Sequence, residues 1–171
     1  LYRRVLERMA TVPGVEAATL STGVPLFGGG FSRTTFRDDQ DTKDPRNGRL
    51  IQVSQVADRY FETLGIPIVR GRAFTPNDRQ GAPPVIIINE VLAKQFFPNE
   101  EALGRYLQMF NWGSRREIVG IARKTKYNFI GEEDTPFIYV PLEQNYSTQV
   151  TVQVRAAGDP DALLGTVRRE L

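Results

Sequence analysis

The sequence predicts an α+β fold in which one lobe is inserted into another. Strand and helix patterns do not alternate regularly, which argues against a doubly wound parallel sheet. The order is helix then strand at the beginning and strand then helix at the end, with a mixed pattern between. A chain of 171 residues can hold one domain with a sizeable insertion. We therefore expect an outer, discontinuous lobe of residues 1–57 and 146–171 and an inserted lobe of residues 58–145.

The first part of the outer lobe begins with an amphipathic helix. Tyr2, Val5, Leu6 and Met9 recur at helical spacing. Pro13-Gly14 ends this helix. Three strands are expected after this helix, at residues 15–21, 34–37 and 50–56. A flexible glycine-rich loop at 25–30 separates the first two strands, and a charged loop at 38–48 separates the last two.

The last part of the outer lobe consists of one strand and one helix. Valines alternate with polar residues over 150–155, which predicts a half-buried strand. Asp159-Pro160 provides the cap and the first position of a helix. We expect three side chains of this helix to point inward: Leu163, Leu164 and Val167.

The inserted lobe opens with a short helix. Asp58 is its expected N-cap, Leu64 its end, and Gly65 the left-handed residue that closes it. Residues 66–69 are expected to be extended. The Thr75–Asp78 segment has turn chemistry, and Pro76 could begin one helical turn.

The rest of the insertion is expected to be mostly strand. The β-branched run 85–88 predicts a strand covered on both faces. Asn89 can cap the following helix, which Pro98 ends. Strands are predicted on both sides of an Asn-Trp-Gly-Ser hairpin turn and in one further apolar run, at 106–110, 117–122 and 137–140.

Composition excludes several classes of function. The chain has no Cys and no His, so zinc, copper, thiol and histidine-based chemistry are excluded. The net charge is only +2 and basic residues are scattered, so no nucleic-acid partner is expected. No apolar run reaches the roughly 20 residues that cross a bilayer. The helical patterns at both ends suggest a piece of a longer chain.

The candidate reactive groups all have simpler explanations. Gly28–Gly30 lacks the lysine and hydroxyl residue of a phosphate-binding loop. The acidic clusters at 38–41 and 132–134 lack the alternating order of a calcium loop and are expected to be solvated. Glu62 and Glu90 fit surface helix positions better than two-carboxylate catalysis. We therefore predict no catalytic residue, no cofactor-binding residue and no metal ligand.

Phe110 and Trp112 are the only candidate contact residues. They lie at the predicted hairpin tip, which is too short to bury a tryptophan by itself. Either another part of the chain covers Trp112, or it contacts a partner.

Several short motifs occur together in one order. They are Pro13-Gly14-Val15, Tyr60-Phe61, Gly65-Ile66, Gly71-Arg72, Phe74, Asn89-Glu90, Phe97-Pro98, Leu103-Gly104, Ile118-Val119-Gly120 and 136–142. In that order and spacing, the chain resembles the MacB-like periplasmic core domain of FtsX-type ABC transporter permeases.

The resemblance implies a porter-like α/β lobe interrupted by a sabre-like α/β lobe. It also implies a non-catalytic extracytoplasmic (periplasmic) domain of a bacterial inner-membrane permease, dimeric in the membrane, that relays motion. An ABC ATPase subunit or domain would act through flanking membrane helices, and a periplasmic adaptor or envelope protein could bind. The family pattern adds strands outside residues 1–171, so an exposed sheet edge is expected here.

Three alternatives stay open at this point. The domain could recruit and activate a cell-wall hydrolase. It could be a carboxylate-based hydrolase, which requires two buried acidic side chains facing each other across a cleft. It could also be a small-ligand binder with a deep apolar pocket between its lobes.

Overall fold

Six strands close into a ring in the computed structural model, which describes residues 2–170. Going round the ring, each strand pairs with the next, and β10 pairs with β5 to complete it. Two of the six contacts are parallel, β7–β9 and β10–β5, and four are antiparallel. We call this ring the barrel; its strands are β4 (Phe31–Arg37), β5 (Arg49–Val56), β7 (Val85–Asn89), β8 (Tyr106–Met109), β9 (Arg116–Ala122) and β10 (Phe137–Pro141).

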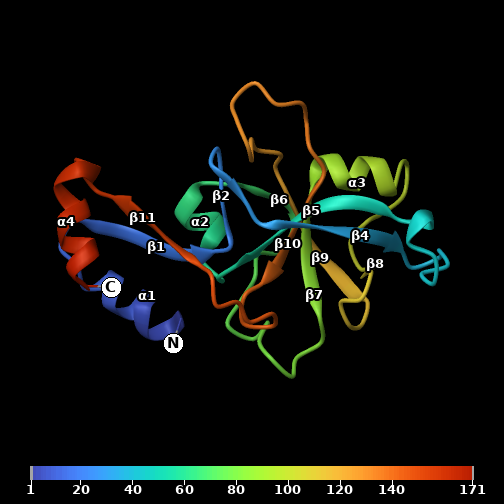
Figure 1. Cartoon of the computed structure of the whole chain (residues 1–171), viewed down its shortest axis with the longest axis horizontal. Coiled ribbons are helices and arrows are strands. Elements are labelled where there is room, and N and C mark those ends of the chain that lie inside the picture. Colours follow the sequence, from blue (N-terminus) through green and yellow to red (C-terminus); the bar gives the residue numbers. More distant parts are fainter. Residues whose placement is uncertain (1, 171) are drawn as a thin grey trace.

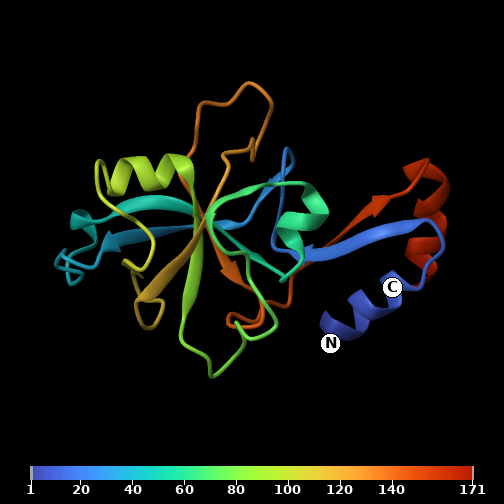
Figure 2. The ribbon, with the colours of Figure 1, turned by 180° about the vertical axis from the view of Figure 1, so that it is seen from behind.

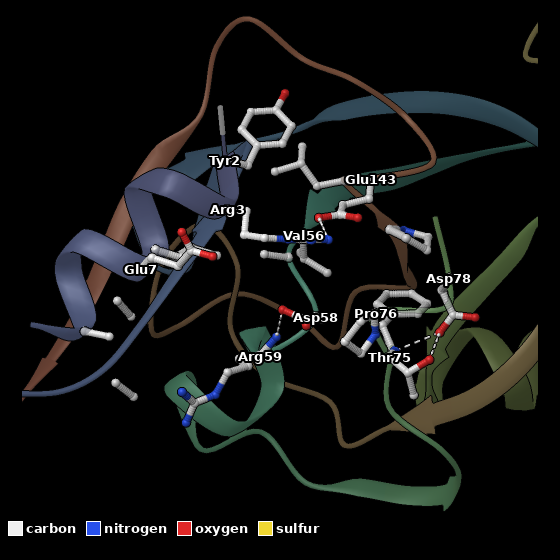
Figure 3. A pocket seen from close by; sticks show the side chains of 18 of the residues that line it. Tyr2, Arg3, Glu7, Val56, Asp58, Arg59, Thr75, Pro76, Asp78 and Glu143 are labelled. Carbon is white, nitrogen blue, oxygen red and sulfur yellow. Dashed lines mark hydrogen bonds and ion pairs between the residues drawn. The ribbon is translucent and has the colours of Figure 1, made fainter. Parts of the chain in front are cut away.

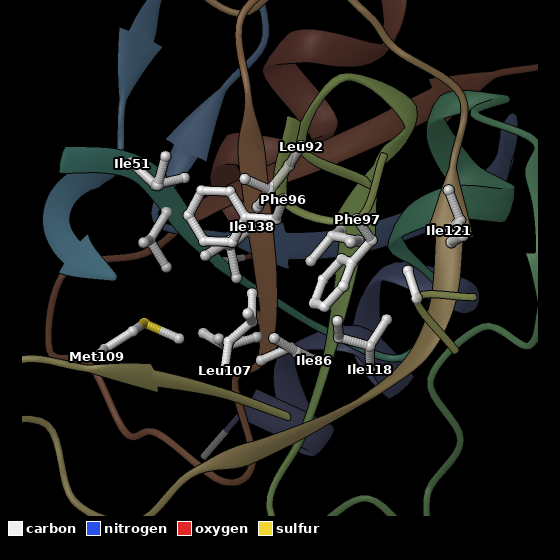
Figure 4. Packing of buried hydrophobic residues seen from close by; sticks show 14 residues of the cluster. Ile51, Ile86, Leu92, Phe96, Phe97, Leu107, Met109, Ile118, Ile121 and Ile138 are labelled. Atoms are coloured by element: carbon white, nitrogen blue, oxygen red, sulfur yellow. The ribbon is translucent and has the colours of Figure 1, made fainter. Parts of the chain in front are cut away.

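The barrel interior is filled by apolar side chains from nearly every strand (Figure 4). Alternate residues of β7 point to opposite sides, because side chains in a strand alternate between its faces. Ile86 and Ile88 join the interior cluster, whereas Val85 and Ile87 join a second cluster outside. All five residues of β7 are buried, which confirms the prediction of a strand covered on both faces.

Two short helices cover the barrel. Leu92 and Phe96 of α3 (Glu90–Phe96) are buried in the interior cluster. Tyr60 and Phe61 of α2 (Tyr60–Leu64) pack in the outer cluster with Tyr139 of β10. A further strand, β6 (Ile68–Gly71), pairs with β9 beside α2.

A two-stranded ribbon extends from the barrel (Figures 1 and 2). Its strands β1 (Val15–Ser21) and β11 (Thr151–Ala156) are antiparallel, and α1 (Tyr2–Ala10) and α4 (Pro160–Glu170) pack against them around Met9 and Val12. We call these four elements the ribbon body. Among residues 2–170, the pairing of β1 with the barrel consists of one residue pair, Ser21 with Val56 of β5.

The pairing does not follow the predicted boundary at residue 57. β4 and β5 were expected in the outer lobe, but they pair with β8 and β10 of the predicted insertion. Ile51 and Val53 also lie in the barrel interior. Local patterns gave no information on these long-range partners. The division into lobes stays a proposal, and the pairing favours a division near residues 22 and 150.

Several local expectations need correction. The glycine-rich loop forms a small hairpin of β2 (Gly23–Val24) and β3 (Gly28–Gly29). The charged loop contains a short 3-10 helix, η1 (Pro45–Asn47), which Asp44 caps. Pro76 begins no helix, since 75–78 is a turn closed by the Asp78 N–H on the Thr75 carbonyl at 2.9 Å. Leu164 is 49% exposed rather than inward, unlike Leu163 and Val167.

The helix caps divide between confirmed and wrong predictions. Asn89 caps α3 by accepting the Leu92 N–H at 2.9 Å. Gly65 closes α2 in the left-handed conformation, with φ of 66°. Asp58 is not the cap of α2. Arg59 holds that position without a side-chain hydrogen bond that caps the helix, and Asp58 accepts the Arg59 N–H.

The ribbon ends the sheet. In the part of the chain that the structure describes, β11 pairs only with β1 and therefore has a free edge. Whether this edge pairs with another copy stays a prediction.

Candidate hinge and contact surfaces

A narrow hydrogen-bonded junction joins the ribbon body to the barrel. Around the single Ser21–Val56 pair, the Ala57 N–H donates to the Leu20 carbonyl at 2.9 Å and the Thr22 N–H to the Gln55 carbonyl at 3.0 Å. Beyond these bonds β1 and β5 separate. A junction of so few hydrogen bonds can bend, because little backbone pairing must break.

Polar side chains fix the chain path at this junction. The Ser21 hydroxyl donates to the Gly23 carbonyl at 2.5 Å. The Gln153 amide of β11 donates to the same hydroxyl at 2.6 Å. Gly23 N–H in turn donates to Ser54 Oγ of the barrel at 3.2 Å. Local hydrogen bonds thus order the junction, and a small apolar cluster of Leu20, Ala57 and Leu142 spans it.

A second set of contacts between the ribbon body and the barrel side joins α1 to the segment after β10. The Ser147 N–H donates to the Tyr2 hydroxyl at 2.8 Å, and the Tyr2 ring stacks on Tyr146 with ring centres 5.4 Å apart. Arg3 and Glu143 form an ion pair at 3.8 Å. Both charged side chains are largely exposed, so this pair contributes only about 0–1 kcal/mol. It does not lock the two bodies together.

Two loops at the barrel end present an exposed apolar patch. Phe27 is 89% exposed and Ile130 is 80% exposed. The loops lie together, since the Leu26 and Gly28 N–H groups both donate to the Tyr127 carbonyl. We call Leu26, Phe27, Phe129 and Ile130 the apolar patch. Neighbouring loops that expose several large apolar side chains are candidates for a contact surface.

The apolar patch was not among the features predicted from the sequence. A signal was present, because these apolar residues lie in glycine-containing loops, where no strand or helix pattern explains them.

The predicted contact residues Phe110 and Trp112 lie at the β8–β9 hairpin, as expected. Trp112 packs edge-on against Phe31 of β4, with ring centres 5.4 Å apart. Arg116 lies over the Trp112 ring at 4.6 Å. Phe110 is half-buried near Phe36. A neighbouring strand thus covers much of Trp112, and a partner contact at this hairpin stays a prediction.

Two carboxylates are buried, and each is held by local partners. Asp78 accepts hydrogen bonds from both terminal nitrogens of Arg72, at 2.7 and 2.9 Å. Glu132 was expected to be solvated, but it is buried and accepts the N–H groups of Tyr127 and Asn128. These hydrogen bonds to the buried Glu132 carboxylate hold the two ends of the loop of residues 127–132 together.

The electrostatics of these carboxylates do not favour acid catalysis. Burial raises the pKa of Asp78 and of Glu132, but hydrogen bonds from their partners outweigh burial and leave each pKa below its usual value. A general acid requires a raised pKa instead. Within residues 2–170 no group of His, Cys, Asp and Glu side chains is arranged to hold a metal ion. The hydrolase hypothesis gains no support.

Comparison with known proteins identifies the family. The model of the MacB-like periplasmic core domain matches residues 2–170. The chain therefore belongs to the MacB-like periplasmic core domain family, whose members are parts of ABC transporter permeases.

Two curated relatives agree with this assignment. The chain is 34% identical over 93 residues to the uncharacterized ABC transporter permease YvrN of Bacillus subtilis (strain 168), which covers 53% of this chain and 22% of YvrN. It is 22% identical over 138 residues to the macrolide export ATP-binding/permease protein MacB of Wolinella succinogenes, which covers 76% of this chain and 20% of that protein. The chain thus spans about a fifth of the length of both relatives.

Solved structures share the fold. The periplasmic region of MacB from Actinobacillus actinomycetemcomitans matches 99% of this chain and 72% of its own, with a TM-score of 0.68 and 15% identity. The extracellular domain of the noncanonic ABC-type transporter YknZ from Gram-positive bacteria matches 97% of this chain and 78% of its own, with a TM-score of 0.65 and 20% identity. These likenesses confirm a mixed α/β fold of the MacB periplasmic type.

None of the helices described between residues 2 and 170 has the length and apolar character needed to cross a bilayer.

Proposed function

We propose that this chain is the extracytoplasmic part of a bacterial ABC transporter permease and that it relays movement between the membrane and partners outside it. In this proposal the domain performs no chemistry. The ribbon body and the barrel act as two stiff parts that change their relative orientation during the transport cycle. The family assignment and the narrow junction at Ser21 and Val56 support the proposal.

The observation that carries the proposal is the contrast between stiff bodies and a weak connection. The barrel is closed by hydrogen bonds around its whole circumference. Its link to the ribbon body consists of one strand pair, the contact of Tyr2 with Ser147, an exposed ion pair, a small apolar cluster around Leu20, and contacts of α2 with β1 and β11. Such a construction transmits displacement, because each body moves as a unit about a short hinge.

The placement of the first and last helices fits this role. α1 and α4 lie together in the ribbon body, where Arg8 bonds Glu170 at 2.8 Å. If membrane helices flank the domain, as the resemblance implies, they connect to the ribbon rather than to the barrel. An ABC ATPase domain or subunit would then drive the ribbon body first. A dimeric, membrane-embedded parent protein belongs to the same proposal.

The apolar patch is the proposed partner surface. Phe27 follows β2, Ile130 lies in the segment between β9 and β10, and both segments lie away from α1 and α4 (Figure 1). A periplasmic adaptor or another envelope protein would bind there, and the Phe110–Trp112 hairpin remains a second contact prediction. Pull-down with the intact permease would identify the partner. Recovery of a cell-wall hydrolase would favour the regulatory alternative instead.

A cleavable clamp across the hinge tests the relay role. Residues 1–171 contain no cysteine. After replacement of every cysteine elsewhere in the full-length permease, Arg3→Cys and Glu143→Cys can be joined there by a short bifunctional thiol reagent. The relay predicts that the clamp stops substrate-dependent ATP hydrolysis and that cleavage of the reagent by a reductant restores it.

The matched control places the same clamp within the barrel. Arg70 and Glu101 form an ion pair between barrel-side segments, so Arg70→Cys and Glu101→Cys receive the same reagent without crossing the hinge. ATP hydrolysis should continue in this variant. Unchanged hydrolysis with the clamp between positions 3 and 143 would contradict the relay role.

A further inference from the structure

A cavity of about 540 Å³ lies between the ribbon body and the barrel (Figure 3). Its walls come from α1, from residues 15–18 of β1, from the segment after β5, from the 74–78 turn and from the end of β10. Its volume falls in the range of roughly 300–1,000 Å³ that is typical of small-molecule sites. The relay role makes no use of this space.

The inner surface of the cavity is largely apolar. Leu20 and its neighbours form the adjoining core, while the cavity itself is lined by Leu6, Ala18, Val56, Ala57, Phe74 and Leu142. Val56 and Leu142 are almost completely buried in the folded chain. Such a surface favours an organic ligand with an apolar body over a hydrated inorganic ion.

The charged side chains around the cavity are unequal in sign. Five acidic and two basic residues line it. Both basic residues already have partners, since Arg3 pairs with Glu143 and Arg59 with Glu62. The two cations therefore do little to attract an anion.

Three of the acidic residues have no ion-pair partner within the part of the chain that is described: Glu7, Glu16 and Asp58. They belong to three different walls, α1, β1 and the segment after β5. Figure 3 shows Glu7 on α1 and Asp58 after β5 on separate walls. In the described part of the chain, carboxylates without an ion pair thus outnumber cations without one on the walls of a largely apolar cavity.

We propose that this cavity binds an organic cation: a small molecule with an apolar body and one permanent or protonated positive centre. The apolar body lies against Ala18, Val56 and Phe74. The positive centre lies toward Glu7, Glu16 and Asp58, where charge complementarity orients it. The inference does not depend on the relay role, because it concerns binding and not movement.

Calorimetric titration of the 171-residue chain with two isosteric ions tests whether the cavity prefers a positively charged ligand. Tetraphenylphosphonium and tetraphenylborate have nearly the same shape and opposite charge. We expect the phosphonium to bind at one site and the borate to bind at least about tenfold more weakly, since the carboxylates repel it. Equal affinity for the two ions would overturn the proposal.

Removal of the three negative charges tests whether Glu7, Glu16 and Asp58 contribute to binding of the cation. The combined variant Glu7→Gln, Glu16→Gln, Asp58→Asn should bind the phosphonium at least roughly threefold more weakly, given the modest strength of partly exposed charge pairs. Glu133→Gln is the matched control, because Glu133 is exposed and lies outside the cavity lining. An unchanged affinity in the combined variant would contradict the proposed role of the charges.

A blocking variant tests the location. Ala10 lines the cavity from the exposed side of α1, so Ala10→Trp fills the space without disturbing the core. Ala162→Trp on the exposed side of α4 is its control. Thermal unfolding followed by circular dichroism verifies that both variants fold. Binding should be lost only in Ala10→Trp, and full binding in that variant would place the phosphonium elsewhere.

Discussion

Two glycines determine how closely β6 approaches β9. Gly71 has φ of +73°, and a Cβ added there would lie 2.3 Å from the Val119 carbonyl oxygen. A Cβ on Gly120 would lie 2.3 Å from the Arg72 carbonyl oxygen. Both contacts are with backbone atoms, which cannot move aside cheaply. The Gly71-Arg72 motif of the sequence therefore has a geometric cause.

We predict that Gly71→Ala destabilises the chain by about 3 kcal/mol, because left-handed strain adds to a backbone clash. Gly113→Ala is the matched comparison. Gly113 has φ of +70° but nothing within 4 Å of an added Cβ, so strain alone should cost about 1 kcal/mol. Urea unfolding measures both values. Equal losses in the two variants would show that the contact with Val119 is unimportant.

Asp78 makes stability depend on pH. Burial opposes its charge, but hydrogen bonds from Arg72 and Thr75 hold its pKa below the usual value in the folded chain. A depressed carboxyl pKa stabilises the folded state above the unfolded pKa of about 3.9. That stabilisation disappears as pH falls below this value and through the folded pKa.

We predict that Asp78→Asn costs about 2 kcal/mol at neutral pH, where charge-assisted hydrogen bonds are lost. The difference between wild type and variant should shrink in acid, because the wild-type carboxyl becomes protonated too. Denaturant unfolding at a series of pH values measures this difference. A difference that stays constant down to strongly acidic pH would contradict the role given to the Asp78 carboxylate.

At the scale of elements, the barrel strands differ in burial from β11 and α4, the last strand and helix of the ribbon body. Every residue of β7 and β10 is buried. In contrast, α4 has no buried residue and β11 has none within Thr151–Ala156. Regions with little buried apolar surface open at lower free energy than the core.

Native-state hydrogen exchange should therefore resolve two groups of amides. We expect Ile87, Ile88 and Tyr139 to exchange only through opening of nearly the whole molecule. Amides of Val152 and Val154 should exchange through smaller openings of the ribbon, with lower free energies. Uniform protection of both groups would indicate that the chain unfolds as a single cooperative unit.

Local signals in the sequence predicted local features well. The buried run at 85–88, the Asn89 cap and the left-handed Gly65 were confirmed, since each depends on neighbouring residues alone. The family resemblance was also confirmed. Closure of the barrel was not predicted, because β5 and β10 pair across about 85 residues of chain. A short sequence pattern carries no information about a partner so far away in the sequence.

The candidate surfaces were predicted only in part. Phe110 and Trp112 were visible as apolar residues at a turn. The apolar patch was missed because its two loops are brought together only by the bonds of Leu26 and Gly28 to Tyr127. The cavity needed the same long-range information, since its walls come from five separate segments. Burial of Glu132 likewise follows from a loop geometry that the charge pattern alone does not contain.

At the scale of the whole molecule, two bodies are joined at one edge and enclose a cavity between them. The hinge crossing and the cavity share Tyr2, Arg3, Val56 and Glu143. A ligand in the cavity would contact both bodies at once. Binding of a cation and relative movement of the two bodies are therefore expected to influence each other.

The central claim, that the two bodies move relative to each other, is tested most directly by a distance measurement. Spin labels on Ala162→Cys of α4 and Glu133→Cys of the barrel report across the hinge in the full-length permease. Labels on Arg70→Cys and Glu133→Cys, both on the barrel side, are the control. The relay predicts that the distance across the hinge shifts between the nucleotide-free and ATP-bound states while the control distance stays fixed. An unchanged distance across the hinge in both states would contradict it.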